Sequence, residues 1–336
     1  MKINFLLYIC ILLTTIFSSP LVAKESKVFS IVNPPQNHIS EEGIVSVVVD
    51  VNNTEIDSLK IVTDINESSI IIDLNRSTYC QSIDLTLGES NITVSGYKGE
   101  TLVKEYVAKV FVVSKVYKDY KYSPEEYKLT HFHNDIKEKV CVKCHDMSIN
   151  EVEGVAFEDV KDSNCYTCHS LVASKQHAHA PAVNWLCTSC HNADVGAHNL
   201  FDKDKSKFIV PDPISSRCFS CHKKMKDKWD KKRFTHEPTD SGRCNKCHNP
   251  HSSDQPNHLR MPVWELCTSC HKDKIEGGHV VKTFSKKIHP THGVKDPSNP
   301  GKDLSCISCH NPHVSDSPSL LESASVMGLC MKCHQK

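Results

Sequence analysis

The chain has 336 residues with 40 basic and 40 acidic side chains, so its formal net charge of zero gives no reason to expect a nucleic-acid partner. It contains 18 cysteines and 21 histidines, far above ordinary usage. A fold without cofactors, metal ions or disulfides would leave this supply of ligands unexplained.

Residues 1–23 have the pattern of a secretory signal peptide. Lys2 is a short positive start, Phe5–Phe17 is mostly apolar, and Leu21-Val22-Ala23 offers a small-residue cleavage site. An uncleaved anchor is the alternative, but a dozen or so apolar residues fall short of the roughly 20 that a spanning helix needs. We therefore expect an exported protein with no transmembrane segment in its mature chain, located in the periplasm, at the cell surface or outside the cell.

Residues 24–118 predict an all-β domain. Short runs rich in Val, Ile and Thr are bounded by Asn, Asp, Gly and Ser, which is typical of a β-sandwich. The predicted strands are Val45–Val51, Leu59–Val62, Ser69–Leu74, Ser82–Leu87, Asn91–Ser95 and Val107–Val113. The stretch Leu87–Val94 resembles the late strands of bacterial immunoglobulin-like or fibronectin-like modules. The resemblance implies an immunoglobulin-like sandwich. Because this domain has no paired carboxylates, nucleophile elbow or glycine-rich phosphate loop, we expect a structural or adhesive role rather than a catalytic one.

Residues 119–130 are charged, aromatic and contain Pro124, which predicts a linker. Before it, Cys80 stands apart from the motifs described below, so we expect a buried free thiol, with an intermolecular disulfide as the alternative.

Eight copies of Cys-x-x-Cys-His follow within residues 131–336 and use sixteen cysteines. Chance would produce far fewer than one copy. The cysteines are Cys141 and Cys144, Cys165 and Cys168, Cys187 and Cys190, Cys218 and Cys221, Cys244 and Cys247, Cys267 and Cys270, Cys306 and Cys309, and Cys330 and Cys333.

The spacing indicates covalent haem c. Two thiols on one helical turn can add to the two vinyl groups of a haem, and the next residue, histidine, then lies beneath the ring to bind iron. Zinc sites and redox dithiols also use Cys-x-x-Cys, but neither requires histidine after every pair. We expect eight haems, with proximal ligands His145, His169, His191, His222, His248, His271, His310 and His334.

The histidines outside the motifs decide whether the sixth coordination position of each iron is occupied by a second imidazole. Three stand eight residues before a motif, two end Cys-His-Asn-Pro-His, two follow Gly-Ala or Gly-Gly, and one precedes proline. These candidate distal ligands are His133, His179, His198, His236, His251, His279, His289 and His313. A reserve consists of His131, His177, His258 and His292, while surface or propionate-contacting roles are the alternative for any one of them. As a set, they predict bis-histidine haems.

A module is repeated in the C-terminal part. The two copies are Cys244–His271 and Cys306–His334, and each contains two Cys-x-x-Cys-His motifs. The first cysteines of the two motifs are 23 residues apart in one copy and 24 in the other. In both copies, Asn-Pro-His follows the first motif and Leu precedes the second. Residues 130–336 therefore resemble the doubled CXXCH motif family of multihaem cytochromes c, less closely in the first three motifs. The resemblance implies stacked bis-histidine haems and electron exchange with periplasmic, outer-surface or extracellular redox proteins.

With about 26 residues per haem, the porphyrins must form most of the core, so we expect short helices, long loops and almost no sheet. The leading hypothesis is an electron carrier without a catalytic residue. One alternative is a multihaem oxidoreductase acting on nitrite, hydroxylamine or a sulfur oxyanion. Another is a subunit that self-assembles or docks to an outer-surface complex through the β domain. The basic run from Lys223 to Arg233 predicts a solvated helix face or a neighbour of haem propionates, with docking to an acidic partner as the alternative.

Overall fold

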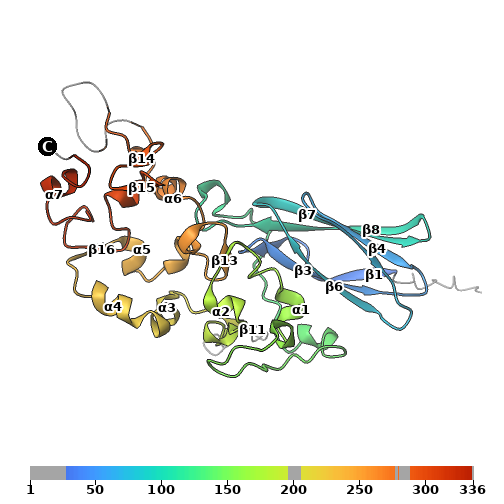
Figure 1. Ribbon diagram of the computed structural model, residues 1–336. Helices are drawn as coiled ribbons and strands as arrows, with labels where there is room; N and C mark the ends of the chain where they lie inside the picture. The colour runs from blue at the N-terminus through green and yellow to red at the C-terminus, as the bar shows by residue number, and fades with distance from the viewer. Residues whose placement is uncertain (1–27, 196–205, 277–278, 280–287, 335–336) are drawn as a thin grey trace, which may run out of the picture.

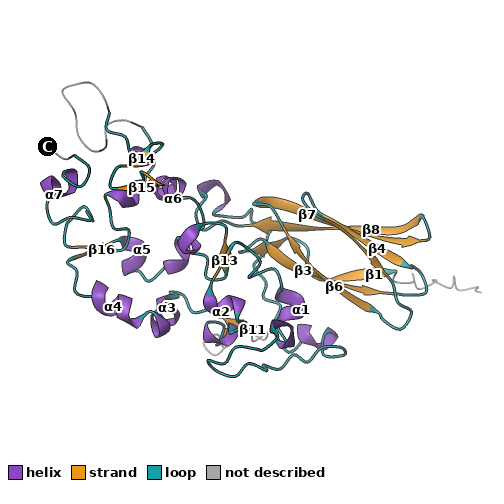
Figure 2. Ribbon diagram, in the orientation of Figure 1, coloured by secondary structure: helices purple, strands orange, loops and turns teal. Residues whose placement is uncertain are grey.

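The computed structural model describes residues 28–195, 206–276, 279 and 288–334; the segment predicted as a signal peptide and His198 lie outside these ranges. Figure 1 shows the strands of residues 29–112 at one end of an elongated molecule and the C-terminus at the other. Figure 2 shows that the part beyond these strands consists of short helices joined by long loops. Among the described residues, no helix is long and apolar enough to cross a membrane.

Two sheets form the N-terminal β-rich region. The first has the order β1-β3-β6 and the second the order β2-β8-β7-β4-β5, in which only the β2–β8 pair is parallel. The strands are β1 (Phe29–Asn33), β2 (His38–Ser40), β3 (Ile44–Val51), β4 (Ser58–Val62), β5 (Glu67–Ile71), β6 (Thr78–Asp84), β7 (Gly88–Lys98) and β8 (Thr101–Val112).

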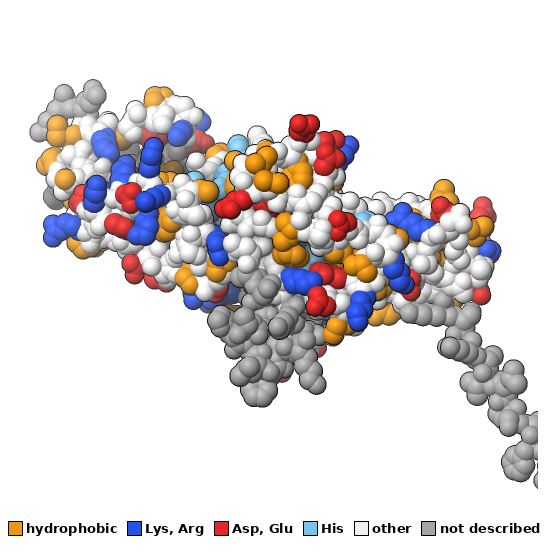
Figure 3. Space-filling model, turned by 90° about the horizontal axis from the view of Figure 1, so that it is seen from below, with side chains coloured by type: hydrophobic (Ala, Val, Ile, Leu, Met, Phe, Trp, Pro, Cys, Tyr) orange, Lys and Arg blue, Asp and Glu red, His pale blue; other side chains and the backbone are white. Residues whose placement is uncertain are grey.

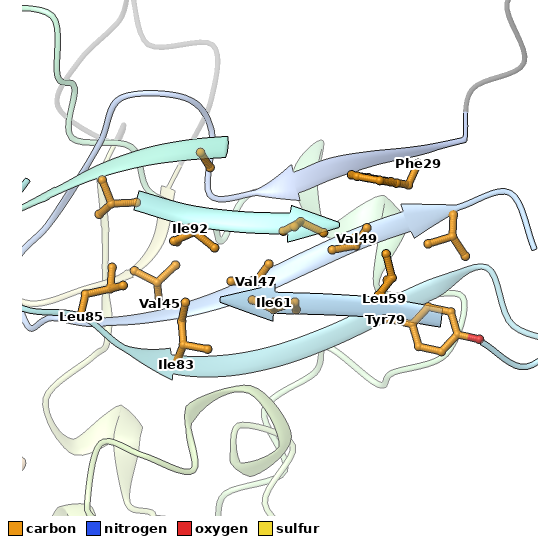
Figure 4. Packing of buried hydrophobic residues seen from close by; sticks show 14 of the residues in the cluster. Phe29, Val45, Val47, Val49, Leu59, Ile61, Tyr79, Ile83, Leu85 and Ile92 are labelled. Atoms are coloured by element: carbon orange, nitrogen blue, oxygen red, sulfur yellow. The ribbon is translucent and has the colours of Figure 1, made fainter. Parts of the chain in front are cut away.

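One apolar core lies between these two sheets (Figure 4). Successive side chains of a strand point to opposite faces, so the alternating residues Val45, Val47 and Val49 of β3 face inward together. They pack with residues of the other sheet, including Leu59 and Ile61 of β4, and all five have at most 5% of their surface exposed. The alternation of polar and apolar residues therefore sets which face of each strand is buried.

Replacing Leu59 with alanine should remove about 3 kcal/mol of unfolding free energy from the β-rich region, because the side chain is fully buried and the cavity cannot fill with neighbours. Urea unfolding followed by circular dichroism measures the loss. Leu102→Ala is the matched control, since Leu102 is 49% exposed and its truncation should cost no more than about 0.5 kcal/mol. Equal losses in the two variants would contradict this account of the core.

The predicted strands match the observed ones with shifted ends. Each of the six overlaps an observed strand, but β5 and β6 end three residues earlier than predicted, and β7 and β8 begin earlier. The pattern missed β1 and β2 altogether, because these short strands depend on pairing with β3 and β8. The predicted linker packs on the sheet: Tyr127 is 3% exposed, and its hydroxyl donates to Glu89 at 2.6 Å.

The cysteine-rich part contains short helical segments at or near its motifs. The helices are α1 (Tyr166–His169), α2 (Ala180–Val183), α3 (Ser215–Cys221), α4 (Lys223–Trp229), α5 (Glu237–Asp240), α6 (Val263–Cys270) and α7 (Val326–Cys330). The 3-10 turns are η1 (Lys118–Tyr120), η2 (Lys137–Val140), η3 (Val160–Asp162), η4 (Cys187–Ser189), η5 (Cys244–Lys246), η6 (Pro256–His258), η7 (Lys272–Lys274) and η8 (Cys306–Ser308).

Within the described residues beyond 130, strands form only two-stranded pairs. They are β9 (His177–Ala178) with β13 (Ser252–Ser253), β10 (Ala193–Val195) with β11 (Ser206–Ile209), β12 (Phe234–Thr235) with β16 (Val314–Ser315), and β14 (Lys295–Asp296) with β15 (Asn299–Asp303). Few apolar residues are buried here: among the described residues beyond 130 they are Trp185, Ile214, Met261, Leu304 and Val314. The side chains described beyond residue 130 therefore make no continuous core.

Candidate functional site

All eight Cys-x-x-Cys-His motifs share one backbone turn. In each, the histidine N–H donates to the carbonyl of the first cysteine, over 2.8–3.1 Å. The donors are His145, His169, His191, His222, His248, His271, His310 and His334. This hydrogen bond closes one helical turn, which brings the two thiols and the imidazole of a motif toward one side of the backbone.

Seven of these motif histidines face a second histidine at nearly the same spacing. The ring centres lie 5.9–6.2 Å apart. The pairs are His169 with His133, His222 with His179, His191 with His251, His271 with His236, His248 with His313, His310 with His279, and His334 with His289.

The constancy of this spacing fits a metal ion between the rings. A coordinating imidazole nitrogen lies about 2 Å from a metal ion and about 1 Å from its own ring centre, so two rings on opposite sides are separated by about 6 Å. Simple aromatic packing tolerates a wide range of distances. The rings of Trp229 and His313, at 4.5 Å, and of Trp264 and His292, at 3.7 Å, show that range in this protein. The interplanar angles of the seven pairs vary from 6° to 68°, as expected if distance alone is fixed.

Hydrogen bonds donated by Nδ1 leave Nε2 available in many of these rings. A carbonyl oxygen can only accept, so a ring whose Nδ1 contacts one carries its proton there, and Nε2 is free to bind a metal ion. Six paired histidines have such a contact, at 2.8–3.0 Å: His179, His191, His236, His248, His289 and His310. This donor set is the one expected of imidazole ligands to iron.

The remaining histidines are placed differently. The ring of His145 has no such counterpart among the described histidines, and His198 lies outside the described ranges. None of the reserve histidines lies opposite a motif histidine: His258 contacts the His179 ring at 5.2 Å, and His292 stacks on Trp264. His131 and His177 have no ring contact within the described part of the chain.

Thiols of consecutive motifs lie close to one another. Hydrogen bonds from Cys187, Cys218 and Cys267 lower the pKa of Cys165, Cys244 and Cys306, respectively, to about 7. Burial raises the pKa of Cys168, Cys190, Cys247 and Cys309, and a cysteine of the neighbouring motif adds to each shift: Cys141, Cys221, Cys270 and Cys333. A thiol of each motif therefore lies close enough to a thiol of the next to affect its pKa, from the first motif to the eighth in the order of the sequence.

A pair of contacts that one histidine makes with an Asn-Pro-His segment, here called a joint, occurs twice between segments distant in sequence. In one copy, the His179 N–H donates to the His251 carbonyl at 2.8 Å, and its Nδ1 contacts the Pro250 carbonyl at 3.0 Å. In the other copy, His236 makes the equivalent contacts with His313, at 2.9 Å, and Pro312, at 3.0 Å. The adjoining strand pairs are β9–β13 and β12–β16. Each Asn-Pro-His segment therefore supplies one paired histidine and also positions a second, which comes from an earlier part of the chain.

The β-rich region contacts the cysteine-rich part directly. Ser46 and Ser82 both donate to the Cys168 carbonyl, at 2.6 and 2.5 Å. The carboxylate of Glu42, in the turn between β2 and β3, accepts from Arg260 at 3.1 Å and from Asn249 at 3.2 Å. No sequence pattern pointed to this ion pair, because its two residues are 218 positions apart.

Replacing Glu42 with alanine should cost about 2 kcal/mol of stability at neutral pH, because the Arg260 guanidinium, which is 13% exposed, keeps the Asn245 carbonyl as acceptor but loses its carboxylate partner. Burial raises the pKa of Glu42, but the charges of Arg260, His251 and Lys115 together with the Arg260 hydrogen bond outweigh burial, so the net pKa is lowered. Since the folded pKa lies below the unfolded value of about 4.3, the contribution is complete above that value and disappears as the pH falls through the folded pKa.

Urea unfolding of the haem-loaded protein at pH 7 and pH 3 measures this difference. Glu41→Ala is the control, because Glu41 is half exposed and its partner Lys115 lies 3.6 Å away, so the loss should stay below about 1 kcal/mol. A Glu42→Ala loss that persists undiminished at pH 3 would contradict the assignment.

Comparison with known proteins gives a family match within the cysteine-rich part. The model of the doubled CXXCH motif family matches residues 236–276 and 299–336. A curated relative, "Multiheme cytochrome MtrA" of Shewanella baltica (strain OS185), is 27% identical over 201 residues, or 58% of this chain and 51% of the relative. The chain thus spans about half the length of that relative.

Solved structures give only weak likenesses. The sulfur carrier protein SoxY from Chlorobium limicola f thiosulfatophilum is 20% identical, with a TM-score of 0.22 over 26% of this chain and 81% of that one. An engineered protein is 14% identical, with a TM-score of 0.22 over 26% and 20%. Likenesses at this level say nothing about fold or function.

Proposed function

Because residues 236–276 and 299–336 belong to the doubled CXXCH motif family of multihaem cytochromes, we propose that this chain is an exported electron carrier with eight covalently attached haems. The observation that carries the proposal is the near-constant separation, 5.9–6.2 Å, of seven histidine pairs. Each pair joins a motif histidine to a histidine outside the motifs, so each would hold one iron from both sides.

The sixteen motif cysteines would attach the haems, and the seven pairs would supply both axial ligands for seven of them. For the eighth, His145 would be the proximal ligand and His198 the distal one, as the sequence predicts. A haem iron between two imidazoles exchanges single electrons and has no open position for a substrate. The carbonyls that accept from Nδ1 keep the ligand rings in one orientation and tautomer.

The thiol contacts support an electron path in chain order. The first motif, at Cys141, lies near Cys80 of β6, and each later motif adjoins the one before it. The last motif ends at His334, beside α7, at the end of the molecule away from the strands (Figure 1). One redox partner would therefore meet the chain near the β-rich region and another near α7.

The partners would be other redox proteins in the periplasm, at the cell surface or outside the cell. Figure 3 shows basic side chains gathered at the end of the molecule away from the strands. Lys223, Lys224 and Lys228 are exposed on α4, which Figure 1 shows at the same end of the molecule. Such a surface suits an acidic partner. The β-rich region would be an immunoglobulin-like sandwich that shields the first motifs, and docking of the chain into an outer-surface assembly through this region is the second candidate function.

Electron paramagnetic resonance of the haem-loaded chain tests the proposal. We expect a haem-to-protein ratio of eight and low-spin signals that account for every iron. The alternative, an oxidoreductase, requires an open iron. A high-spin signal perturbed by nitrite or hydroxylamine would therefore contradict the electron-carrier function and support an oxidoreductase.

A further inference from the structure

One of the paired histidines has a different hydrogen-bond partner. Nδ1 of His133 contacts Oε1 of Glu138 at 3.1 Å. By contrast, six other paired histidines donate from Nδ1 to a backbone carbonyl, which is a neutral acceptor. Among the described histidines that face a motif histidine, His133 is the one whose Nδ1 partner is a carboxylate.

The carboxylate is held in a dry, fixed environment. The side chain of Glu138 is 6% exposed, and its second oxygen, Oε2, accepts from Lys207 at 2.9 Å. Lys207 also pairs with Asp135, whose side chain is 86% exposed. The rings of Phe132 and Phe208 meet the His133 ring edge-on, at 5.6 and 5.2 Å. Apolar neighbours reduce solvent screening, so the charge of Glu138 acts strongly on the ring.

A carboxylate that accepts from Nδ1 makes the imidazole a stronger electron donor at Nε2 than a carbonyl does. Stronger donation stabilises the more positive, oxidised iron and lowers its reduction potential. Lys207 opposes this effect only in part, because it binds the oxygen away from His133 and shares its charge with Asp135. The charge nearest the ring is therefore negative.

We infer that Glu138 sets the haem held by His133 and His169 to a lower reduction potential than the haems whose ligands hydrogen-bond to carbonyls. The inference rests on the proposed function, since it requires a haem between these two rings. An electron that moves in chain order then meets an uphill step at the second motif, close to the β-rich region. Glu138 is a positioning residue that acts on iron through its ligand.

Glu138→Gln tests this role in the full, haem-loaded protein. Glutamine has the same shape and can still accept from Nδ1, but it carries no charge. Redox potentiometry should show one of the eight one-electron components shifted upward, with its reduced-to-oxidised ratio at fixed potential changed at least tenfold, which is about 59 mV. The control is Asp135→Asn, which removes an 86% exposed charge from the same lysine and should shift the component by much less than Glu138→Gln does.

A second variant guards against disruption of the fold. Lys207→Met removes the cation that offsets Glu138, so it should shift the same component downward. Opposite shifts in the two variants cannot come from general loosening of the site. If Glu138→Gln retains eight low-spin haems but leaves every potential in place, or if Asp135→Asn shifts the component equally, the inference is wrong and the carrier function stands. A wild-type protein with fewer low-spin haems would instead contradict the proposed function.

Discussion

Replacing His313 with alanine should turn one of the eight irons high-spin and remove about one-eighth of the low-spin intensity. His313 faces His248 with ring centres 6.0 Å apart, and the Trp229 ring stacks on it at 4.5 Å. Removal of the imidazole leaves a gap that no described histidine is placed to fill. Because this pair lies in the middle of the motif order, transfer between the two ends of the chain should also slow.

Spin quantification by electron paramagnetic resonance measures the first effect, and stopped-flow reoxidation of the reduced protein measures the second. His292→Ala is the matched control. Its ring stacks on Trp264 and faces no motif histidine, so all eight irons should stay low-spin. Retention of the full low-spin intensity in His313→Ala would show that His313 is not a ligand.

Chain produced without haem attachment should keep only its β-rich region folded. The one hydrophobic cluster of the described chain is confined to residues 28–112. The cysteine-rich part buries five large or branched apolar side chains over 184 described residues, too few to offset the entropy of ordering the backbone. Folding of that part should therefore depend on the cofactor.

Limited proteolysis with mass spectrometry tests this directly. A resistant fragment should end after about residue 128, since Lys128 donates to the Asn37 carbonyl at 2.8 Å and Tyr127 is buried. The haem-loaded chain is the control and should resist cleavage throughout its motifs. Equal resistance of residues 131–334 with and without haem would contradict the view that haem forms the core.

Local pattern predicts the features that are local. The repeated motif predicts its helical turn, and alternation in Val45–Val51 predicts a buried strand face, because both depend on neighbouring residues only. Pairing depends on tertiary structure. His133 precedes the first motif by eight residues yet faces His169 of the second, and His236 precedes the fifth motif yet faces His271 of the sixth.

The charged partners of these residues could not be predicted from the sequence either. Glu138 lies three residues before Cys141 and resembles any surface glutamate until the fold brings Lys207 and His133 around it. Glu42 similarly acquires its role from Arg260, which belongs to a different part of the chain. Whether a carboxylate changes a reduction potential or joins two parts of the chain depends on its burial and its neighbours. The adjacent residues in the sequence specify neither.

The joint that His179 makes with Pro250 and His251 is repeated, with the same atoms and nearly the same distances, where His236 meets Pro312 and His313. Because each copy needs only a histidine upstream and an Asn-Pro-His downstream, a further copy would require no new type of contact. Gene duplication could therefore change the span of such a protein in whole units. The number of copies, rather than the redesign of any surface, would then determine how far apart its two redox partners stand.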